Sequence, residues 1–178
     1  GLPGSGKTTI FEALTRHFTA GRHKEETRIG TIPVSDKRVD VLSAMYQPGK
    51  TIYAQVEYLL PGIKGHQKEN AWIQVRNCDA MIHVVRNFTG YGREAPTPYE
   101  DFRKLDQELI FSDLVVTEKR LERLALDQRR GQKIHQEELS LLKESRELLE
   151  NEKPLRKFAD LASAPILKGY TFLSAKPV

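Results

Sequence analysis

The most constraining feature of the sequence is its first nine residues, GLPGSGKTT, which lead directly into a segment with apolar residues at helical spacing. The pattern predicts a phosphate-binding loop, because glycines let backbone N–H groups wrap around a phosphate at the start of a helix. We expect Lys7 to reach the β- and γ-phosphates of a nucleoside triphosphate and the Thr8 hydroxyl to bind Mg²⁺. The residues predicted to bind nucleotide are Gly1, Pro3, Gly4, Ser5, Gly6, Lys7, Thr8 and Thr9.

Between this loop and residue 99, patterns typical of strands alternate with patterns typical of helices. The run 80–85 is apolar except for His83, which favours a strand covered on both faces and makes His83 a core residue rather than a ligand. Strands alternating with helices predict a parallel or mixed α/β sheet. The predicted strands are 30–34, 51–60 and 80–85, and the predicted helices are 35–47 and 67–77.

The composition changes after the Gly-, Pro- and Tyr-rich stretch 89–99. Residues 100–151 contain no proline and one glycine, and leucines recur at helical spacing between charged residues. This predicts an antiparallel helical hairpin that turns at 129–131, with an apolar seam largely internal to the hairpin. We therefore expect three parts: 1–99 as the first part of a nucleotide-binding domain, 100–154 as an inserted hairpin, and 155–178 as a return to the sheet.

Charge and cysteine usage exclude several classes of protein. The chain has 28 Lys and Arg against 24 Asp and Glu, and residues 101–158 carry 13 of each sign, which argues against a one-sided nucleic-acid clamp. The single Cys78 excludes a disulfide scaffold and a cysteine zinc site, and indicates a reducing, cytoplasmic compartment. No apolar run approaches the roughly 20 residues that a membrane span needs, so no membrane partner is expected. Because the sequence begins with Gly1, it is interpreted as a fragment.

Four further segments carry a family resemblance. They are TIPVSDKRVDVL at 31–42, AQVEYLLPG at 54–62, CDAMIHVVRNF at 78–88 and ELIFSDLVVTEKRLERL at 108–124. In this order, and with the closing LSAKPV, they resemble the YchF subfamily of the Obg-related GTPases, also called Obg-like ATPases. The resemblance implies an α/β P-loop NTPase fold, a three-layer G-domain sandwich with an inserted coiled-coil hairpin. It also implies slow hydrolysis of GTP or ATP with Mg²⁺ as cofactor, and an association with translation and the ribosome.

The sequence departs from the family pattern at the site itself, so the chain is interpreted as a divergent member. The family loop has Asn-Val where this chain has Gly4 and Ser5. The family's second switch, D-x-x-G, supplies a glycine N–H to the γ-phosphate, a role that falls here to Gly62, while Leu59 stands where the metal-binding aspartate is expected. The nearest acid is Glu57.

The first switch of the family needs a threonine that meets Mg²⁺, and Thr27 is the nearest candidate. The predicted metal ligands are thus Thr8 and Thr27, and the predicted catalytic groups are Lys7 and Gly62.

Two other functions stay open at this stage. The loop sequence GLPGSGKTT is also common in small-molecule kinases, although no lid or acceptor-site arginine cluster is evident. Alternatively, the chain is a degenerate nucleotide-binding module that acts through its hairpin. The tip at Arg129 and Arg130 is either a solvated face or a contact for ribosome, RNA or protein. The base-specificity motif of the family is expected after Val178, so the preference for adenine or guanine stays open.

Overall fold

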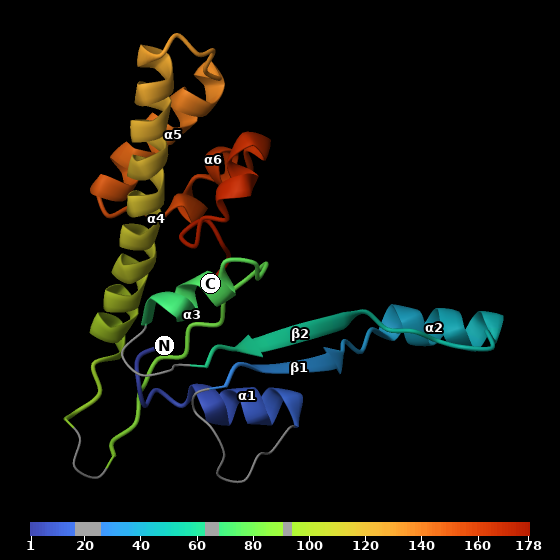
Figure 1. The fold of residues 1–178 in the computed structure, drawn as a ribbon. Coiled ribbons are helices and arrows are strands. Elements are labelled where there is room, and N and C mark those ends of the chain that lie inside the picture. Colours follow the sequence, from blue (N-terminus) through green and yellow to red (C-terminus); the bar gives the residue numbers. More distant parts are fainter. Residues whose placement is uncertain (17–25, 63–67, 91–93) are drawn as a thin grey trace. The chain divides into compact units, whose positions relative to one another are not determined.

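The computed structural model describes residues 1–16, 26–62, 68–90 and 94–178 (Figure 1). The chain divides into two compact units. One comprises Gly6–Trp72, and the other comprises Gly1–Ser5 together with Ile73–Val178. The glycine-rich loop before α1 is therefore part of the covalent connection between the two units.

The unit Gly6–Trp72 is built on a two-stranded antiparallel sheet. Arg28 lies opposite Leu60 in this sheet, so β1 begins at the end where β2 finishes. Helix α1 packs on the sheet close to Gly30, where an added Cβ would approach the Thr15 side chain to 2.4 Å. The elements are α1 (Lys7–Thr15), β1 (Arg28–Pro33), α2 (Lys37–Tyr46), β2 (Gln55–Leu60) and the first part of α3 (Lys68–Val75).

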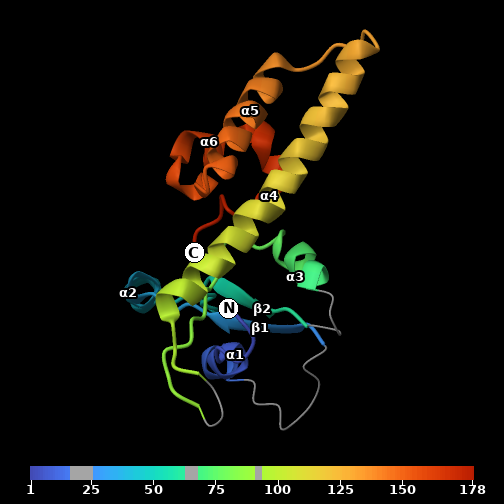
Figure 2. The same ribbon diagram turned by 90° about the vertical axis from the view of Figure 1, so that its left-hand side faces the viewer.

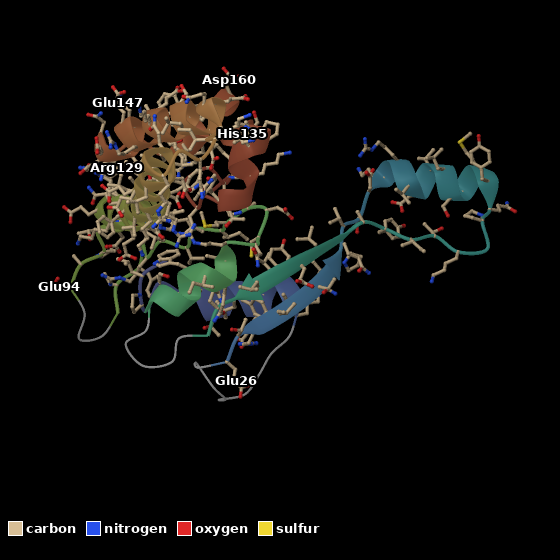
Figure 3. All side chains as sticks on the ribbon, turned by 45° about the horizontal axis from the view of Figure 1, so that its top comes forward. Glu26, Glu94, Arg129, His135, Glu147 and Asp160 are labelled. Atoms are coloured by element: carbon tan, nitrogen blue, oxygen red, sulfur yellow. The ribbon has the colours of Figure 1, made fainter. Side chains whose placement is uncertain are left out.

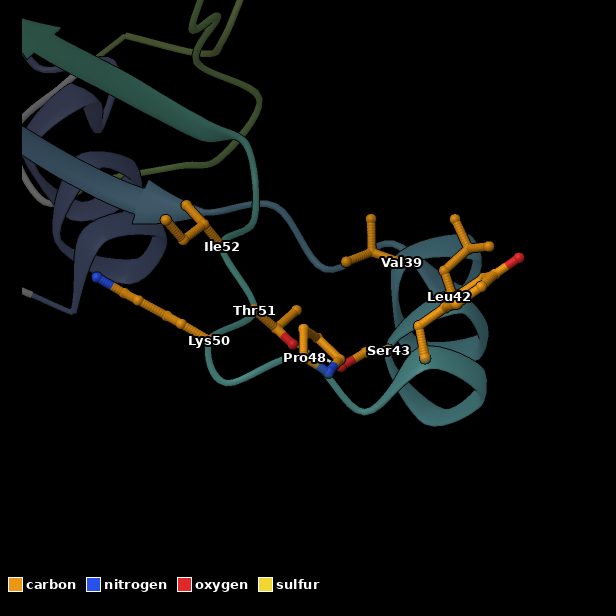
Figure 4. Close-up of a pocket in the computed structure, with 8 residues that line it drawn as sticks. Val39, Leu42, Ser43, Pro48, Lys50, Thr51 and Ile52 are labelled. Carbon is orange, nitrogen blue, oxygen red and sulfur yellow. Dashed lines mark hydrogen bonds between the residues drawn. The ribbon is translucent and has the colours of Figure 1, made fainter.

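Helix α2 confirms a predicted helix but does not cover the sheet. Its N-cap, Asp36, accepts a hydrogen bond from the backbone N–H of Arg38 at 2.9 Å, as expected for a helix start. None of its residues is buried, and Met45 and Tyr46 are 68% and 75% exposed. A shallow hollow of about 300 Å³ lies between α2 and the following loop; Leu42, Ser43, Thr51 and Ile52 are among its lining residues (Figure 4).

The second unit is dominated by a long pair of helices (Figures 1 and 2). The predicted hairpin is confirmed: α4 (Pro98–Arg129) and α5 (Gln136–Glu150) are joined by a turn in which Gly131 has φ 76°. The chain continues through η1 (Leu155–Lys157), α6 (Ala159–Ser163) and η2 (Pro165–Tyr170).

The expectation of an apolar seam internal to the hairpin is wrong. The main core of this unit is shared between the hairpin and the residues after Pro154, because a two-helix seam leaves one side of each helix to be covered. The buried members of this core are Ile110, Leu124, Leu142, Leu149, Leu155, Leu161, Leu167 and Phe172.

A buried carboxylate fixes the segment after η2 against α4. Asp113 is fully buried and accepts hydrogen bonds from the backbone N–H groups of Leu173 at 3.0 Å and Ser174 at 2.6 Å. Arg76 reaches the same carboxylate at 3.3 Å and also donates to the carbonyl of Thr171. Burial raises the pKa of the Asp113 carboxyl, against the lowering effect of these hydrogen bonds.

The predicted strand 80–85 and the predicted sheet type are wrong for the described residues. The run 80–85 forms no strand, and Ile82 is 60% exposed. Residues 171–178 also form no strand, although Met81 N–H donates to the Pro177 carbonyl at 2.9 Å. The only sheet in the described residues is antiparallel, whereas a parallel or mixed sheet was expected. An apolar run becomes a strand only where a neighbouring strand supplies hydrogen-bond partners, and a hydrophobic pattern does not report that neighbour.

His83 packs against an aromatic ring, although the strand expected around it does not form. Its ring is half-buried and stacks on Phe102 with 5.0 Å between ring centroids. Loss of hydration lowers the pKa of His83 to about 4, so the ring is neutral at pH 7. Across the described ranges, no helix combines the length and the apolar character that crossing a membrane requires.

Candidate phosphate-binding site

The loop that precedes α1 has the backbone of an anion cradle. Gly4 has φ 79° and Gly6 has φ 94°, both in the left-handed region that glycine adopts readily. The family resemblance places asparagine at Gly4, and asparagine is among the few other residues that tolerate this conformation. Gly6 is the N-cap of α1 and makes no side-chain cap hydrogen bond. The backbone at the start of a helix favours an anion, so this loop geometry fits a phosphate.

The first residue of the motif must be glycine for a different reason. A Cβ on Gly1 would lie 1.9 Å from the carbonyl oxygen of Val84 and 2.6 Å from the Ser5 hydroxyl. Ser5 is 5% exposed, and its hydroxyl has no hydrogen-bond partner among the described residues. The Ser5 N–H closes the turn by donating to Leu2 O at 3.2 Å.

Three polar side chains follow the loop on the first turn of α1. Lys7 is partly buried, and loss of hydration lowers the pKa of its ammonium group. Thr8 and Thr9 are exposed. A partly dehydrated cation gains more from a phosphate than a hydrated one does, so the position of Lys7 fits a phosphate ligand.

The switch residues proposed from the sequence lie at one end of the sheet. Thr27 directly precedes β1, and Gly62 follows β2 by two residues. The Gly62 N–H donates to the Thr27 hydroxyl at 3.3 Å, so the structure brings these two predicted residues together. Helix α1 begins at the same end of this unit (Figure 1).

The residues present do not make a complete Mg²⁺ site. Leu59 is on β2 opposite Ile29 and has no oxygen to offer, and Glu57 is exposed opposite Thr31. Within the described part of the chain, no group of three or more His, Cys, Asp or Glu is placed to hold a metal ion. The predicted ligand Thr27 is engaged by Gly62. The loop therefore fits the phosphates, whereas the metal site lacks its carboxylate.

An ion pair that sequence patterns did not indicate ties α1 to the start of β1. Arg28 bonds Glu12 at 3.1 Å, and its guanidinium also lies over the Phe11 ring at 4.9 Å from the centroid. The pair therefore holds α1, which begins at Lys7, close to the start of β1 next to Thr27. The two residues are far apart in sequence, and no local spacing links them. Asp113, by contrast, had a visible signal: it is an acid among apolar residues on a helix.

Basic and acidic residues are concentrated in different parts of the hairpin, although residues 101–158 contain equal numbers of each. Residues 119–136, called the tip of the hairpin below, carry six Lys or Arg and two Asp or Glu. Residues 137–152 carry two Lys or Arg and six Asp or Glu. Arg120 is paired with Glu138. The other five basic side chains of the tip are exposed and form no ion pair among the described residues: Lys119, Arg123, Arg129, Arg130 and Lys133. Figure 3 labels Arg129 and, on the acidic part of α5, Glu147.

Known proteins similar to this chain include several with the name ribosome-binding ATPase YchF. The protein from Haemophilus ducreyi is 31% identical over 193 aligned residues, which cover 99% of this chain and 53% of that protein. The protein from Bacillus subtilis is 28% identical and is matched by 100% of this chain over 53% of its own length. The chain thus spans about half the length of the curated relatives it matches.

A solved structure is similar along the whole chain. The YchF GTPase of Schizosaccharomyces pombe superposes with a TM-score of 0.75 at 25% identity, over 100% of this chain and 53% of that one. No protein-family profile matches the sequence.

Proposed function

We propose that the chain, which is homologous over its whole length to the YchF family of ribosome-binding ATPases and spans about half of their length, binds a nucleoside triphosphate through residues 1–9. The observation that carries this proposal is the loop backbone, with left-handed Gly4 and Gly6 opening directly into α1. The nucleotide is ATP or GTP. Gly1, Pro3, Gly4, Ser5 and Gly6 form the cradle, and Lys7, Thr8 and Thr9 follow on the helix.

Lys7 supplies the side-chain charge of the site. Its ammonium, with the loop N–H groups, would neutralise the β- and γ-phosphates, and a charge-assisted contact of this kind is worth about 1.5–3 kcal/mol. Bound Mg²⁺ would supply further neutralisation of the phosphate oxygens, and Thr8 is the protein group proposed for it. Thr27, the other ligand suggested by the sequence, accepts the Gly62 hydrogen bond in this structure.

Nucleotide affinity measured with fluorescent ATP and GTP tests the proposal. Lys7→Ala is expected to weaken binding about ten- to a hundredfold. Lys37→Ala removes an exposed lysine at the start of α2 and is the matched control, expected to bind as the parent does. Equal affinity in the parent and in Lys7→Ala would show that the loop is not the nucleotide site.

We further propose slow hydrolysis, so that the chain acts as a nucleotide-dependent switch. Water would attack the γ-phosphate in line, with Lys7 and the loop amides stabilising the developing charge and the Gly62 N–H holding the terminal phosphate. Leu59 in place of the expected acid supports a low turnover. The same observation favours the second candidate function, an interaction module that binds nucleotide and hydrolyses little.

The domain organisation proposed from the sequence extends beyond the described sheet. We propose that 1–99 and 155–178 belong to a three-layer P-loop G domain, of which β1, β2 and α1 are part, and that 100–154 is an insertion. The similarity to the S. pombe YchF GTPase over the whole chain supports this.

Ribosome association is proposed through the tip of the hairpin, and a cytoplasmic location follows from that proposal. The relatives are named ribosome-binding, and the net charge of +4 over residues 119–136 is complementary to an RNA backbone. The exposed basic side chains lie along the end of α4 and in the turn after it, where the phosphates of an RNA would contact them.

A further inference from the structure

The hydrogen bond between Gly62 and Thr27 occupies a donor that the proposed function needs. Gly62 is buried, and its N–H donates to the Thr27 hydroxyl at 3.3 Å. A buried amide without an acceptor is costly, so the Thr27 hydroxyl stabilises this conformation of Pro61 and Gly62. The bond links the residue before β1 to a residue just beyond β2.

One N–H group serves one strong acceptor at a time. A phosphate oxygen is an ionised acceptor and forms a stronger hydrogen bond than a neutral hydroxyl does. If the Gly62 amide holds the terminal phosphate of a bound nucleotide, the Thr27 hydroxyl must first release it. A nucleoside diphosphate has no terminal phosphate at that position and leaves the bond in place.

We propose that Thr27 is a specificity-determining residue that lowers the preference of the site for triphosphate over diphosphate, by competing with the γ-phosphate for the Gly62 N–H. This inference rests on the proposed nucleotide site and adds to it a role for Thr27 different from that of a metal ligand. Triphosphate binding breaks the Thr27 bond, whereas diphosphate binding does not. The competition makes the Gly62 N–H respond to the terminal phosphate alone.

Three variants of the chain test the proposal. Thr27→Val keeps the shape of the side chain and removes the acceptor, Thr27→Ser keeps the hydroxyl, and Thr31→Val makes the same change at an exposed position on β1. Affinities are measured for ADP and GDP and for non-hydrolysable analogues of ATP and GTP. Thr27→Val is expected to bind the triphosphate analogues about three- to tenfold more tightly, with diphosphate affinity unchanged. Thr27→Ser and Thr31→Val should match the parent.

A second measurement does not depend on affinity. Hydrogen exchange of the Gly62 amide, followed by NMR without nucleotide, should be faster in Thr27→Val than in Thr31→Val. In the parent, the Gly62 resonance should shift on addition of the triphosphate analogue and stay in place on addition of ADP or GDP.

The outcomes separate this inference from the function on which it rests. Weaker triphosphate binding in Thr27→Val would show that Thr27 is a ligand of the nucleotide or its metal, and would overturn the competition. An unchanged ratio of triphosphate to diphosphate affinity would also overturn it, while leaving the nucleotide site intact. If the parent binds no nucleotide, both proposals fail, and an unaltered Gly62 exchange rate would show that the bond itself is absent.

Discussion

Arg120 of α4 and Glu138 of α5 form a two-bond ion pair across the hairpin, with N–O distances of 2.8 and 3.1 Å. The Tyr170 hydroxyl donates to the same carboxylate and also accepts from Arg120 at 3.1 Å. The pair therefore connects both hairpin helices to the segment after α6. The Arg120 guanidinium beside Glu138 lowers the pKa of that carboxyl below 4.5.

The first prediction concerns the pH dependence of this pair. Since the pKa of Glu138 is lower in the folded than in the unfolded chain, the pair stabilises the fold above about pH 4.5, and this is lost as the pH falls through the folded pKa. Glu138→Gln should lower the free energy of unfolding by about 1 kcal/mol at pH 7, because solvent screens the partly exposed Arg120. Thermal unfolding of the parent and of Glu138→Gln between pH 3 and pH 7 measures this difference in stability. The exposed Glu147→Gln is the control, and an equal loss in both variants would contradict the assignment.

Removing the buried carboxylate should have a larger effect. Asp113→Ala leaves the N–H groups of Leu173 and Ser174 and the Arg76 guanidinium without their acceptor, at an expected cost of about 3–5 kcal/mol. Urea unfolding measures this cost, with the exposed Asp160→Ala as the control. Asp113→Asn retains one acceptor oxygen and should lose less. A loss under about 1 kcal/mol in Asp113→Ala would show that the network contributes little.

Nucleotide affinity should decline at high pH because of Lys7. The lowered pKa of this lysine means that its charge is lost at a pH below the ordinary 10.5, and the neutral amine cannot neutralise a phosphate. The nucleotide phosphates are fully ionised well below this range, since their last pKa is about 6, so they do not mask the change. Binding of ATP and GTP is measured from pH 7 to pH 10. Lys7→Arg stays charged throughout and should show no decline; a parallel decline in both proteins would assign the effect elsewhere.

Restoring an acid at position 59 should strengthen the dependence on Mg²⁺. The ratio of nucleotide affinity with Mg²⁺ to that with EDTA is expected to rise roughly tenfold in Leu59→Asp, the size of one charge-assisted contact. Leu59→Asn has the same shape without the charge and is the control. Glu57→Gln should leave the ratio of the parent unchanged. If Glu57→Gln abolishes the Mg²⁺ effect, Glu57 already serves as the metal-site acid.

The basic tip should be needed for RNA. Reversing Arg129 and Arg130 to glutamate is expected to weaken binding of ribosomes or ribosomal RNA and to reduce its dependence on salt, because fewer phosphate counterions are released. The same charge change at Lys104 and Lys143, which are exposed elsewhere on the hairpin, is the control. Co-sedimentation at two salt concentrations measures both. Equal weakening in the two double variants would indicate a net-charge effect rather than a site.

The local features of this chain were open to prediction because short-range physics determines them. The loop conformation followed from the glycine-rich motif, and the left-handed backbone at Gly4 and Gly6 accords with the glycines there. The hairpin followed from a long leucine periodicity without proline, and its turn falls at Gly131, where φ is 76°. Each depends on residues within a few turns of one another.

Other features were decided only by partners distant in the sequence. The run 80–85 has a strand-like pattern, but no neighbouring strand pairs with it among the described residues. β1 and β2 pair antiparallel, with Arg28 opposite Leu60. The core of the hairpin is completed by residues after Pro154, and Asp113 is buried because Leu173 and Ser174 supply its hydrogen bonds. The sequence by itself determined the loop and the helices through local backbone preference and periodicity. Tertiary structure decided strand pairing, shared burial and the Thr27–Gly62 bond, since these depend on which distant groups satisfy one another.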